Sequence, residues 1–250
     1  MFHVKQEPRG VDVPRETPRG QFHVKQGYFV TGTGTGVGKT FVTAALARRA
    51  RQLARQVFAF KPIETGCRQE NGQWIGADQQ ELVAAAGGWQ QGALVGAYQF
   101  EPPVAPSVAA ARAGVEISIE QALAQPNAAL RGDPPFEQVD FVLVEGAGGW
   151  RVPVTPTQDM SALAAAAGLP VLVAALATLG TLNHTLLTVE AIERDGQRCA
   201  GVILSQRPDD EVTLVESNLV ELRARWKGPI VALSTAPSVL DPFIRPPSWR

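Results

Sequence analysis

The feature that most constrains the fold is the segment 28–40, which has the sequence YFVTGTGTGVGKT. An apolar strand runs here into a glycine-rich loop, and the loop ends in Gly38-Lys39-Thr40 at the start of a helical stretch. The backbone N–H groups of such a loop surround a phosphate, the lysine reaches the outer phosphates, and the threonine hydroxyl ligates Mg²⁺. The general pattern has a glycine five residues before Gly38, whereas this chain has Thr33 there and Gly32 one residue earlier. The segment therefore predicts triphosphate binding by a loop one residue longer than the general form.

Strands and helices are predicted to alternate after residue 26. The predicted strands are 28–31, 57–61, 139–145, 170–176, 200–204 and 229–233, and the predicted helices are 39–54, 78–86, 104–113, 117–130, 160–167, 181–194 and 209–226. The central strands are continuous apolar runs, such as FVLV at 141–144, which are typical of a parallel sheet covered on both faces. We therefore predict an α/β fold with a doubly wound, mostly parallel sheet and helices on both faces. Functional residues should collect at the C-terminal ends of its strands.

The two ends of the chain differ from this α/β region in composition. FHVKQ occurs at 2–6 and again at 22–26, within a segment rich in proline and charge that has no apolar periodicity. Such a segment buries too little apolar surface to fold, so we predict that residues 1–26 are a disordered extension. The Pro-rich tail, 236–250, is predicted to be irregular. One α/β domain is then expected over residues 27–235.

Composition argues against several classes of function. A net charge of −1 with 19% charged residues argues against a nucleic-acid-binding surface. No apolar run approaches the roughly 20 residues that cross a bilayer, and the N-terminus lacks the apolar segment of a signal peptide. Cys67 and Cys199 have no metal-ligand or redox spacing, which indicates structural thiols, although Cys67 is close to a candidate active-site loop. We expect a cytoplasmic protein with no membrane or nucleic-acid partner.

A second candidate segment, KPIETG at 61–66, directly follows the second predicted strand. Pro62 keeps Lys61 extended, so the Lys61 ammonium should emerge at the ligand-binding edge of the sheet. After residue 26 the chain contains only three lysines, Lys39, Lys61 and Lys227. One interpretation of Lys61 is an ordinary surface lysine at a strand end. The scarcity of lysine favours a catalytic or anion-holding role instead.

Two carboxylates are candidate ligands for Mg²⁺. Glu145 ends a buried strand and begins a second glycine-rich turn, EGAGGW at 145–150, which suits a metal beside a bound anion. The alternative for Glu145 is a strand-end charge paired with an arginine. Asp78 opens a predicted helix, where aspartate is a preferred N-cap. Spacing alone therefore leaves a metal role and a capping role for Asp78 equally open.

Taken together, these segments resemble the dethiobiotin synthetase family. The matching segments are, in chain order, 28–40, 61–66, the helix start at 78, PPVAP at 102–106, 144–150 and LGTLNH at 179–184. The resemblance implies a P-loop NTPase fold and an ATP- and Mg²⁺-dependent ligase of biotin biosynthesis. It also implies the reaction, in which 7,8-diaminopelargonate and CO₂ form a carbamate, ATP converts the carbamate to a carbamic-phosphoric anhydride, and ring closure gives dethiobiotin.

The resemblance further implies roles for individual residues. Lys39 and Lys61 are the implied catalytic cations, and Thr40, Asp78 and Glu145 are the implied Mg²⁺ ligands. The implied nucleotide-binding residues are Gly36, Val37, Gly38, Lys39, Thr40, Phe41, Asp78, Glu145, Gly146, Ala147 and Gly148, with Ser205 and Gln206 where relatives commonly place an asparagine for adenine. The implied substrate-binding residues are Thr35, Lys61, Thr65, Gly148, Leu179, Gly180, Thr181, Leu182 and Asn183.

A homodimer with sites at the subunit interface is also implied by the resemblance. Residues 179–183 would bind the substrate carboxylate in the neighbouring subunit's site, and a carboxylate at a helix N-terminus is physically reasonable. The alternative is a plain strand-to-helix turn. The chain departs from the family at Gly34 and Gly36, where many relatives have an acidic residue at 34 and some at 36. It also departs at Ser205-Gln206, so triphosphate binding is better supported than a preference for adenine.

Three other functions remain as alternatives. A nucleotide-switched partitioning or assembly ATPase has a similar fold, but its signature lysine would fall at position 34, which is Gly34 here. An amide-forming enzyme of the cobyric-acid type carries an additional glutaminase domain, for which 250 residues leave no room. A purely structural nucleotide-binding module is disfavoured by Lys61 and Thr65.

Overall fold

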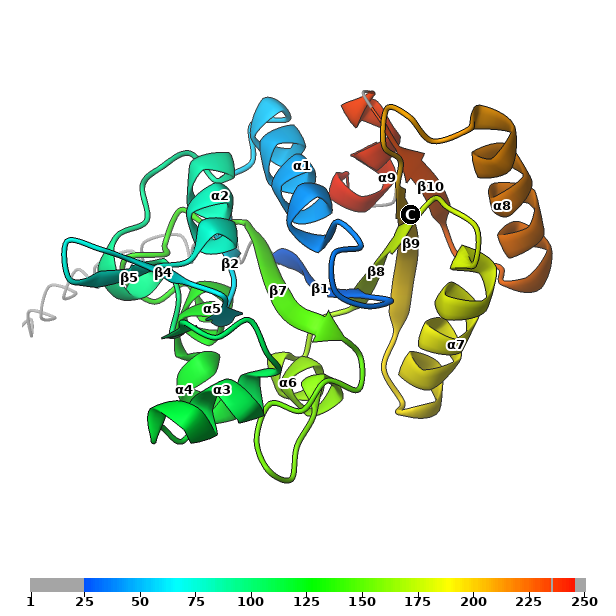
Figure 1. Ribbon diagram of the computed structural model, residues 1–250. Helices are drawn as coiled ribbons and strands as arrows, with labels where there is room; N and C mark the ends of the chain where they lie inside the picture. Colours follow the sequence, from blue (N-terminus) through cyan, green and yellow to red (C-terminus); the bar gives the residue numbers. More distant parts are fainter. Residues whose placement is uncertain (1–24, 235, 246–250) are drawn as a thin grey trace, which may run out of the picture.

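A parallel sheet forms the centre of the computed structural model, which describes residues 25–234 and 236–245 (Figure 1). Over these residues the sheet has six strands in the order β10-β9-β8-β1-β7-β2, and all of its pairs are parallel. The strands are β1 (Gln26–Gly32), β2 (Val57–Phe60), β7 (Phe141–Gly149), β8 (Val171–Leu176), β9 (Cys199–Ser205) and β10 (Ile230–Leu233). The predicted α/β class is therefore confirmed. Because β1 lies between β7 and β8, the loop that leaves β1 emerges at the middle of the sheet.

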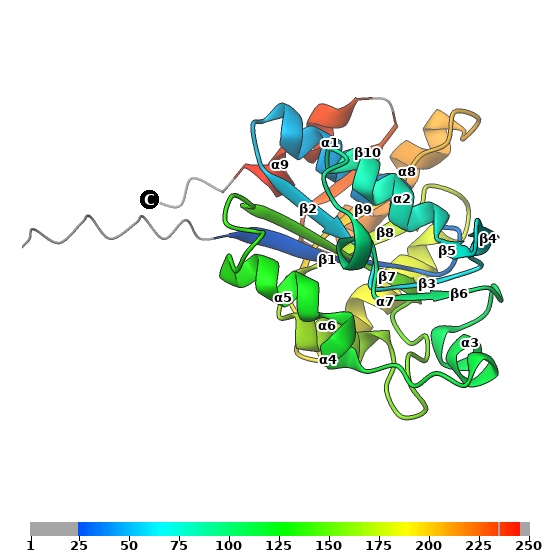
Figure 2. The ribbon, with the colours of Figure 1, turned by 90° about the vertical axis from the view of Figure 1, so that its left-hand side faces the viewer.

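Helices cover both faces of the sheet (Figures 1 and 2). One face packs against α1 (Lys39–Gln52), α2 (Ala77–Ala85) and α9 (Asp241–Ile244), and the other packs against α5 (Ala124–Arg131), α6 (Met160–Ala167), α7 (Thr181–Arg194) and α8 (Val212–Arg225). Successive side chains of a strand point to opposite faces. In β7, Phe141 and Leu143 accordingly join the first core, whereas Val142 and Val144 join the second. The continuous apolar run of β7 therefore packs into the hydrophobic cores on both faces of the sheet.

The helix predicted over 117–130 is broken in the structure. It forms α4 (Ile119–Ala122) and α5, which begins at Ala124. Pro126 explains the break, because a proline ring clashes with the carbonyl group four residues earlier, here that of Ala122. Similarly, the helix predicted from residue 104 begins at Pro106 as α3 (Pro106–Ala113), with the proline in the first turn.

Short strands between β2 and α3 were absent from the prediction. β3 (Ile63–Thr65) pairs in parallel with β6 (Tyr98–Phe100), and a 3₁₀ turn, η1 (Gly92–Leu94), precedes β6. β4 (Arg68–Glu70) and β5 (Gln73–Ile75) form an antiparallel hairpin. Its turn is Asn71-Gly72, and both residues have positive φ, of 50° and 80°. Asn-Gly is a strong hairpin signal, so the sequence contained this information.

Both ends of the predicted domain need correction. The prediction of disorder for residues 1–24 lies outside the described residues, but Lys25 and Gln26 belong to the folded region. The Lys25 ammonium donates to the carbonyl groups of Ala129 and Phe136, at 2.7 and 2.8 Å, and Gln26 begins β1. The tail 236–250 is predicted to be irregular, but its described part forms a 3₁₀ turn, η2 (Pro237–Leu240), followed by α9; residues 246–250 lie outside the described residues.

The α9 segment packs against the core because it carries apolar side chains. Leu240, Phe243 and Ile244 are at most 2% exposed, and they belong to the same core cluster as α1. A Cβ atom on Gly201 would lie 2.4 Å from the Phe243 ring, so glycine in β9 makes room for this ring. The proline content that suggested irregularity is therefore outweighed by buried apolar area.

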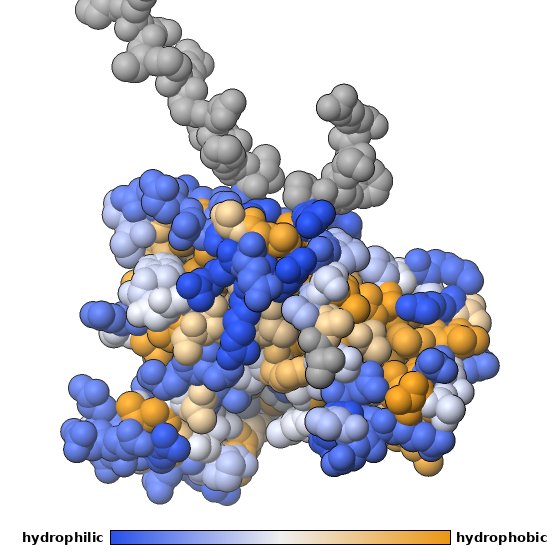
Figure 3. Space-filling view, turned by 90° about the horizontal axis from the view of Figure 1, so that it is seen from above, coloured by the Kyte–Doolittle hydropathy of each residue, from blue (hydrophilic) through white to orange (hydrophobic). Residues whose placement is uncertain are grey.

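The surface above the α1 and α2 side of the sheet is largely hydrophilic, with apolar patches between the polar groups (Figure 3). Over the described part of the chain, none of the helices combines the length and apolar character needed to cross a membrane.

Candidate active site

The loop between β1 and α1, residues 33–38, forms the centre of the candidate site. Gly36 and Gly38 have φ values of 72° and 89°, a left-handed conformation that favours glycine. A Cβ atom on Gly32 would lie 2.7 Å from a methyl group of Val37, so the start of the loop has no space for a side chain. α1 begins at Lys39, where the N–H groups of a first helical turn have no intrahelical partner. The loop therefore combines compact backbone with unpaired helix N–H groups.

A cavity of about 550 Å³ lies beside this loop and collects residues from separate segments of the chain. The predicted site residues that line it are Thr35, Gly36, Gly38, Lys39, Thr40, Phe41, Lys61, Thr65, Asp78, Ala147 and Gly148. They come from the β1–α1 loop, the start of α1, the ends of β2 and β7, β3 and the start of α2. As expected for a parallel sheet, these segments meet at one edge.

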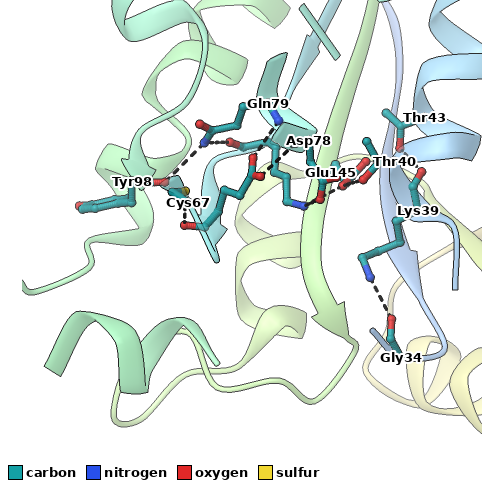
Figure 4. Close-up of polar contacts among 11 residues, drawn as sticks. Gly34, Lys39, Thr40, Thr43, Cys67, Asp78, Gln79, Tyr98 and Glu145 are labelled. Atoms are coloured by element: carbon teal, nitrogen blue, oxygen red, sulfur yellow. Dashed lines mark hydrogen bonds and ion pairs between the residues drawn. The ribbon is translucent and has the colours of Figure 1, made fainter. Parts of the chain in front are cut away.

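Lys61 lies between two carboxylates at this edge. Its Nζ atom is 3.1 Å from Oε1 of Glu145 and forms a second ion pair with Oδ2 of Asp78. The Thr40 hydroxyl donates to the same Glu145 oxygen at 2.9 Å (Figure 4). Lys39 points the other way and donates to the carbonyl oxygen of Gly34 at 2.9 Å. Glu145 is therefore partnered by a lysine and a threonine, and the arginine alternative is wrong.

The structure also decides the local role of Asp78. The N-cap of α2 is Gly76, and Asp78 lies in the first turn with its side chain paired to Lys61. The capping alternative is therefore wrong. An acidic residue in this turn is still favourable, because the helix N-terminus carries partial positive charge.

The two lysines have different electrostatic environments. Burial lowers the pKa of Lys61, but Glu145 and Asp78 raise it by more, so the pKa of Lys61 lies above its usual value. Burial lowers the pKa of Lys39 to about 8, with Glu145 opposing this effect and Lys61 adding to it. Both ammonium groups are therefore mainly protonated at neutral pH, and Lys39 is closer to losing its proton.

Thr40, Asp78 and Glu145 fit a Mg²⁺ ion held jointly with phosphate. Oε2 of Glu145 is buried and has no hydrogen-bond partner, an arrangement that a cation would satisfy. Mg²⁺ is commonly bound by one or two carboxylates together with substrate phosphates and water. Over residues 25–234 and 236–245, no group of three or more His, Cys, Asp or Glu side chains is placed to hold a metal. The remaining ligands would therefore come from the nucleotide.

Ser205 and Gln206 lie at a second cavity, of about 580 Å³, on the other side of Phe41. Phe41 is 45% exposed and lines both cavities. Ser205 is buried against the phosphate loop, and a Cβ atom on Gly38 would lie 2.5 Å from its hydroxyl. Gln206 is therefore better placed than Ser205 to contact a bound group in this second cavity.

Some predicted site residues do not line the main cavity. Val37 is 8% exposed beneath the loop, and Gly146 is buried, where a Cβ atom would lie 3.0 Å from the sulfur of Met160. Residues 179–183 form the turn after β8 and the start of α7, and none of them lines the main cavity. Leu179 is 88% exposed. Within one chain, the segment 179–183 is therefore separate from Lys61.

Comparison with known proteins identifies the family. A family model described as an AAA domain matches residues 26–233. ATP-dependent dethiobiotin synthetase of Nitrosospira multiformis is 39% identical, over 83% of this chain and 87% of the relative. The enzyme of the same name from Anaeromyxobacter dehalogenans is 40% identical, over 86% of this chain and 92% of the relative. The one from Xanthomonas axonopodis pv. citri is 36% identical, over 81% of this chain and 87% of the relative. The chain belongs to the dethiobiotin synthetase family.

Solved structures extend the fold comparison beyond the dethiobiotin synthetase family. The MinD cell division protein of Aquifex aeolicus has a TM-score of 0.51 at 13% identity, over 88% of this chain and 86% of MinD. A chain of the MinC:MinD cell division protein complex of the same organism has a TM-score of 0.52 at 11% identity, over 88% of this chain and 85% of that one. This likeness is one of fold alone.

The cavity of this dethiobiotin synthetase family member is also lined by residues that were not predicted to belong to the site. One wall is formed by the end of the loop before α3 and the first residue of that helix, namely Pro103, Val104, Ala105 and Pro106. Val152, three residues after the end of β7, also lines the cavity. The PPVAP segment was conspicuous, but no chemistry in its side chains pointed to a site. Its position follows from β6, which brings the chain back beside β3.

Proposed function

We propose that this chain catalyses the ATP- and Mg²⁺-dependent conversion of 7,8-diaminopelargonate and CO₂ to dethiobiotin. Its family makes it an ATP-dependent cyclo-ligase. The observation that carries the reaction is the position of Lys61, which shares one cavity with the phosphate loop and with the hydroxyl groups of Thr35 and Thr65. Such a cavity suits a reaction between a triphosphate and a second anion.

The proposed reaction begins with attack of one substrate amine on CO₂, which gives a carbamate and releases a proton. A carbamate oxygen then attacks the γ-phosphorus of ATP, and ADP leaves. The second amine attacks the carbamoyl carbon of this mixed anhydride, the ureido ring closes, and phosphate leaves. The second step brings two anions together, so its barrier depends on concentrated positive charge.

Lys39 and Lys61 supply this positive charge. Lys39 donates to Gly34 in the structure, and we propose that a γ-phosphate oxygen replaces this carbonyl as its acceptor. Lys61 is held near the sheet edge by Asp78 and Glu145, where it would stabilise the carbamate. Mg²⁺ bound through Thr40, Asp78 and Glu145 would neutralise phosphate charge. The hydroxyl groups of Thr35 and Thr65 would orient the carbamate.

We further propose that the enzyme is a homodimer in which residues 179–183 serve the neighbouring subunit's site. Leu179, in the turn before helix α7, is 88% exposed, and Leu187 on α7 is 57% exposed. α7 begins at Thr181, and helix N-terminal N–H groups bind carboxylates. This segment does not line the main cavity of its own chain, which supports a role in a second subunit. Cys67 and Cys199 are free thiols, which supports a location in the reducing cytoplasm.

The proposed reaction is tested by incubating the protein with 7,8-diaminopelargonate, bicarbonate, Mg²⁺ and ATP. We expect ADP release that depends on diaminopelargonate, together with formation of dethiobiotin measured by mass spectrometry. ATP hydrolysis at the same rate with and without diaminopelargonate would contradict the proposal and would favour a nucleotide-switched ATPase. Omission of Mg²⁺ should abolish both products.

A further inference from the structure

Glu64 is a buried carboxylate close to the active site but outside the cavity. It belongs to β3, is 5% exposed, and does not line the cavity that contains Lys61 and Asp78. Burial raises the pKa of Glu64, and the charge of Lys61 together with two backbone hydrogen bonds opposes this effect. A carboxylate that is removed from water needs hydrogen-bond partners in the protein.

Those partners are at the start of α2. The backbone N–H groups of Asp78 and Gln79 donate to the two oxygens of Glu64, at 2.9 and 2.8 Å. Gly76, the N-cap of α2, has no side chain that could cap the helix. A Cβ atom on Gly76 would lie 2.4 Å from a Glu64 oxygen, so this carboxylate occupies the space that a side chain would fill. Glu64, which belongs to strand β3, therefore provides the side-chain cap for the N-terminus of α2.

Gln79 connects the same turn to Lys61. Its side-chain amide donates to the carbonyl oxygens of Lys61 and Tyr98, at 3.0 and 3.4 Å (Figure 4). Its own oxygen accepts a hydrogen bond from Gln99 at 2.6 Å. Gln79 is fully buried. The backbone of Lys61 and the backbone of Asp78 are thus held by one buried polar network, and such networks fix a single arrangement when every member is satisfied.

We propose that Glu64 is a positioning residue, which holds the first turn of α2 so that Asp78 meets the Lys61 ammonium. It acts through Asp78 and touches neither nucleotide nor substrate. For turnover, this inference rests on the proposed function. A displacement of about 1 Å at a reacting group lowers the rate by up to about a hundredfold. We therefore expect Glu64→Ala to lower kcat between about tenfold and a hundredfold.

The test separates positioning from simple helix capping. We use a double-mutant cycle that consists of Glu64→Ala, Asp78→Ala and the variant with both substitutions. For each protein we measure kcat, the Kd of a nonhydrolysable ATP analogue with Mg²⁺, and the urea midpoint of unfolding. The capping bonds go to backbone N–H groups, which Asp78→Ala retains. The loss in urea midpoint caused by Glu64→Ala should therefore persist without Asp78. In the Asp78→Ala background, Glu64→Ala should have no further effect on kcat or Kd, because the side chain that Glu64 positions is already absent.

Further variants control for folding and for capping in general. Ser118→Ala removes the N-cap of α4, which accepts from Gln121 at 3.3 Å, and it should lower stability with kcat unchanged. Glu64→Gln keeps one acceptor oxygen and should recover part of the lost kcat. If Glu64→Ala does not fold, Gly76→Ala displaces the carboxylate more mildly and should reproduce the loss.

Two outcomes would overturn the inference. Either the effects of Glu64→Ala on kcat and Kd remain undiminished in the Asp78→Ala background, or Glu64→Ala matches Ser118→Ala with lower stability and unchanged kcat and Kd. Failure of the proposed function is distinguishable, because the wild-type protein would then show no diaminopelargonate-dependent turnover. In that case the double-mutant cycle, measured on the Kd of the ATP analogue, still decides whether Glu64 positions Asp78.

Discussion

At the scale of single residues, the site depends on how Lys61 is neutralised. Its side chain is 7% exposed, and two carboxylates from different elements balance its charge. A buried charge that loses its partner is strongly unfavourable, so removal of Lys61 affects Glu145 as well. The lysine therefore has a structural effect in addition to its proposed catalytic one.

Lys61→Ala is expected to abolish ring formation, a loss of at least about a hundredfold in kcat, because a preorganised cation is removed from the reacting anions. The fold should remain, with a loss of about 2 kcal/mol in the free energy of unfolding, because Glu145 is left with a weaker set of partners. Dethiobiotin formation, circular dichroism and urea unfolding measure these effects. Lys227→Ala, at an exposed lysine, is the matched control. Retained turnover in Lys61→Ala would remove Lys61 from the mechanism.

The cysteines give a second test at this scale. Burial raises the pKa of Cys67 to about 11 and that of Cys199 to about 12. The reactive thiolate is therefore scarce below these values and increases as the pH rises toward them. At pH 8 we expect Ellman's reagent to react with the native protein at least about a hundredfold more slowly than with the unfolded chain, which should show two thiols. Rapid labelling of one thiol in the native protein would show an accessible thiolate.

At the scale of elements, the C-terminal segment belongs to the fold. Two hydrogen bonds from the Arg49 guanidinium to Asp241, at 2.7 and 3.0 Å, join α1 to α9. Phe243 is buried beside them, with an edge-on contact to Tyr28 in β1. Since α1 and β1 flank the phosphate loop, α9 supports the elements that carry the site.

Phe243→Ala is expected to lower the free energy of unfolding by about 3 kcal/mol, because it leaves a cavity in the core against Gly201. Urea unfolding at equilibrium measures this change. Val220→Ala on α8 is the control, because Val220 is 64% exposed and its truncation should change stability by less than about 0.5 kcal/mol. Equal effects of the two variants would mean that α9 is not part of the core.

At the scale of the whole molecule, the proposed dimer divides each site between two chains. Lys61 would come from one subunit and the segment 179–183 from its partner. In solution the mass should be twice the 26.7 kDa of one chain, which light scattering measures. A monomer with full activity would contradict the shared site.

Mixed dimers test the shared site directly. We expect Lys61→Ala and Asn183→Ala homodimers to be impaired, because each lacks one part of both sites. After subunit exchange, a mixed dimer regains one site with both parts intact, so an equimolar mixture should recover about a quarter of wild-type activity. No gain above the mean of the two separate variants would place residues 179–183 outside the neighbouring site.

The sequence by itself determined the features that depend on neighbouring residues. The phosphate loop, the alternation of strands and helices, and the position of Lys61 at a strand end follow from local spacing and from backbone preferences. Even the missed β4–β5 hairpin has a local signal, at Asn71-Gly72. Together these motifs were specific enough to indicate the family.

Only the tertiary structure decided which side chains meet. Thr40 and Glu145 are 105 residues apart, and Arg49 and Asp241 are 192 residues apart, so no local pattern connects them. Glu64 caps α2 in place of the Ser, Thr, Asp or Asn side chain that usually caps a helix from the N-cap position itself. The physical reason is the same in each case. Buried charges and apolar side chains take whichever partners the folded chain brings within reach, and distance along the sequence does not limit them.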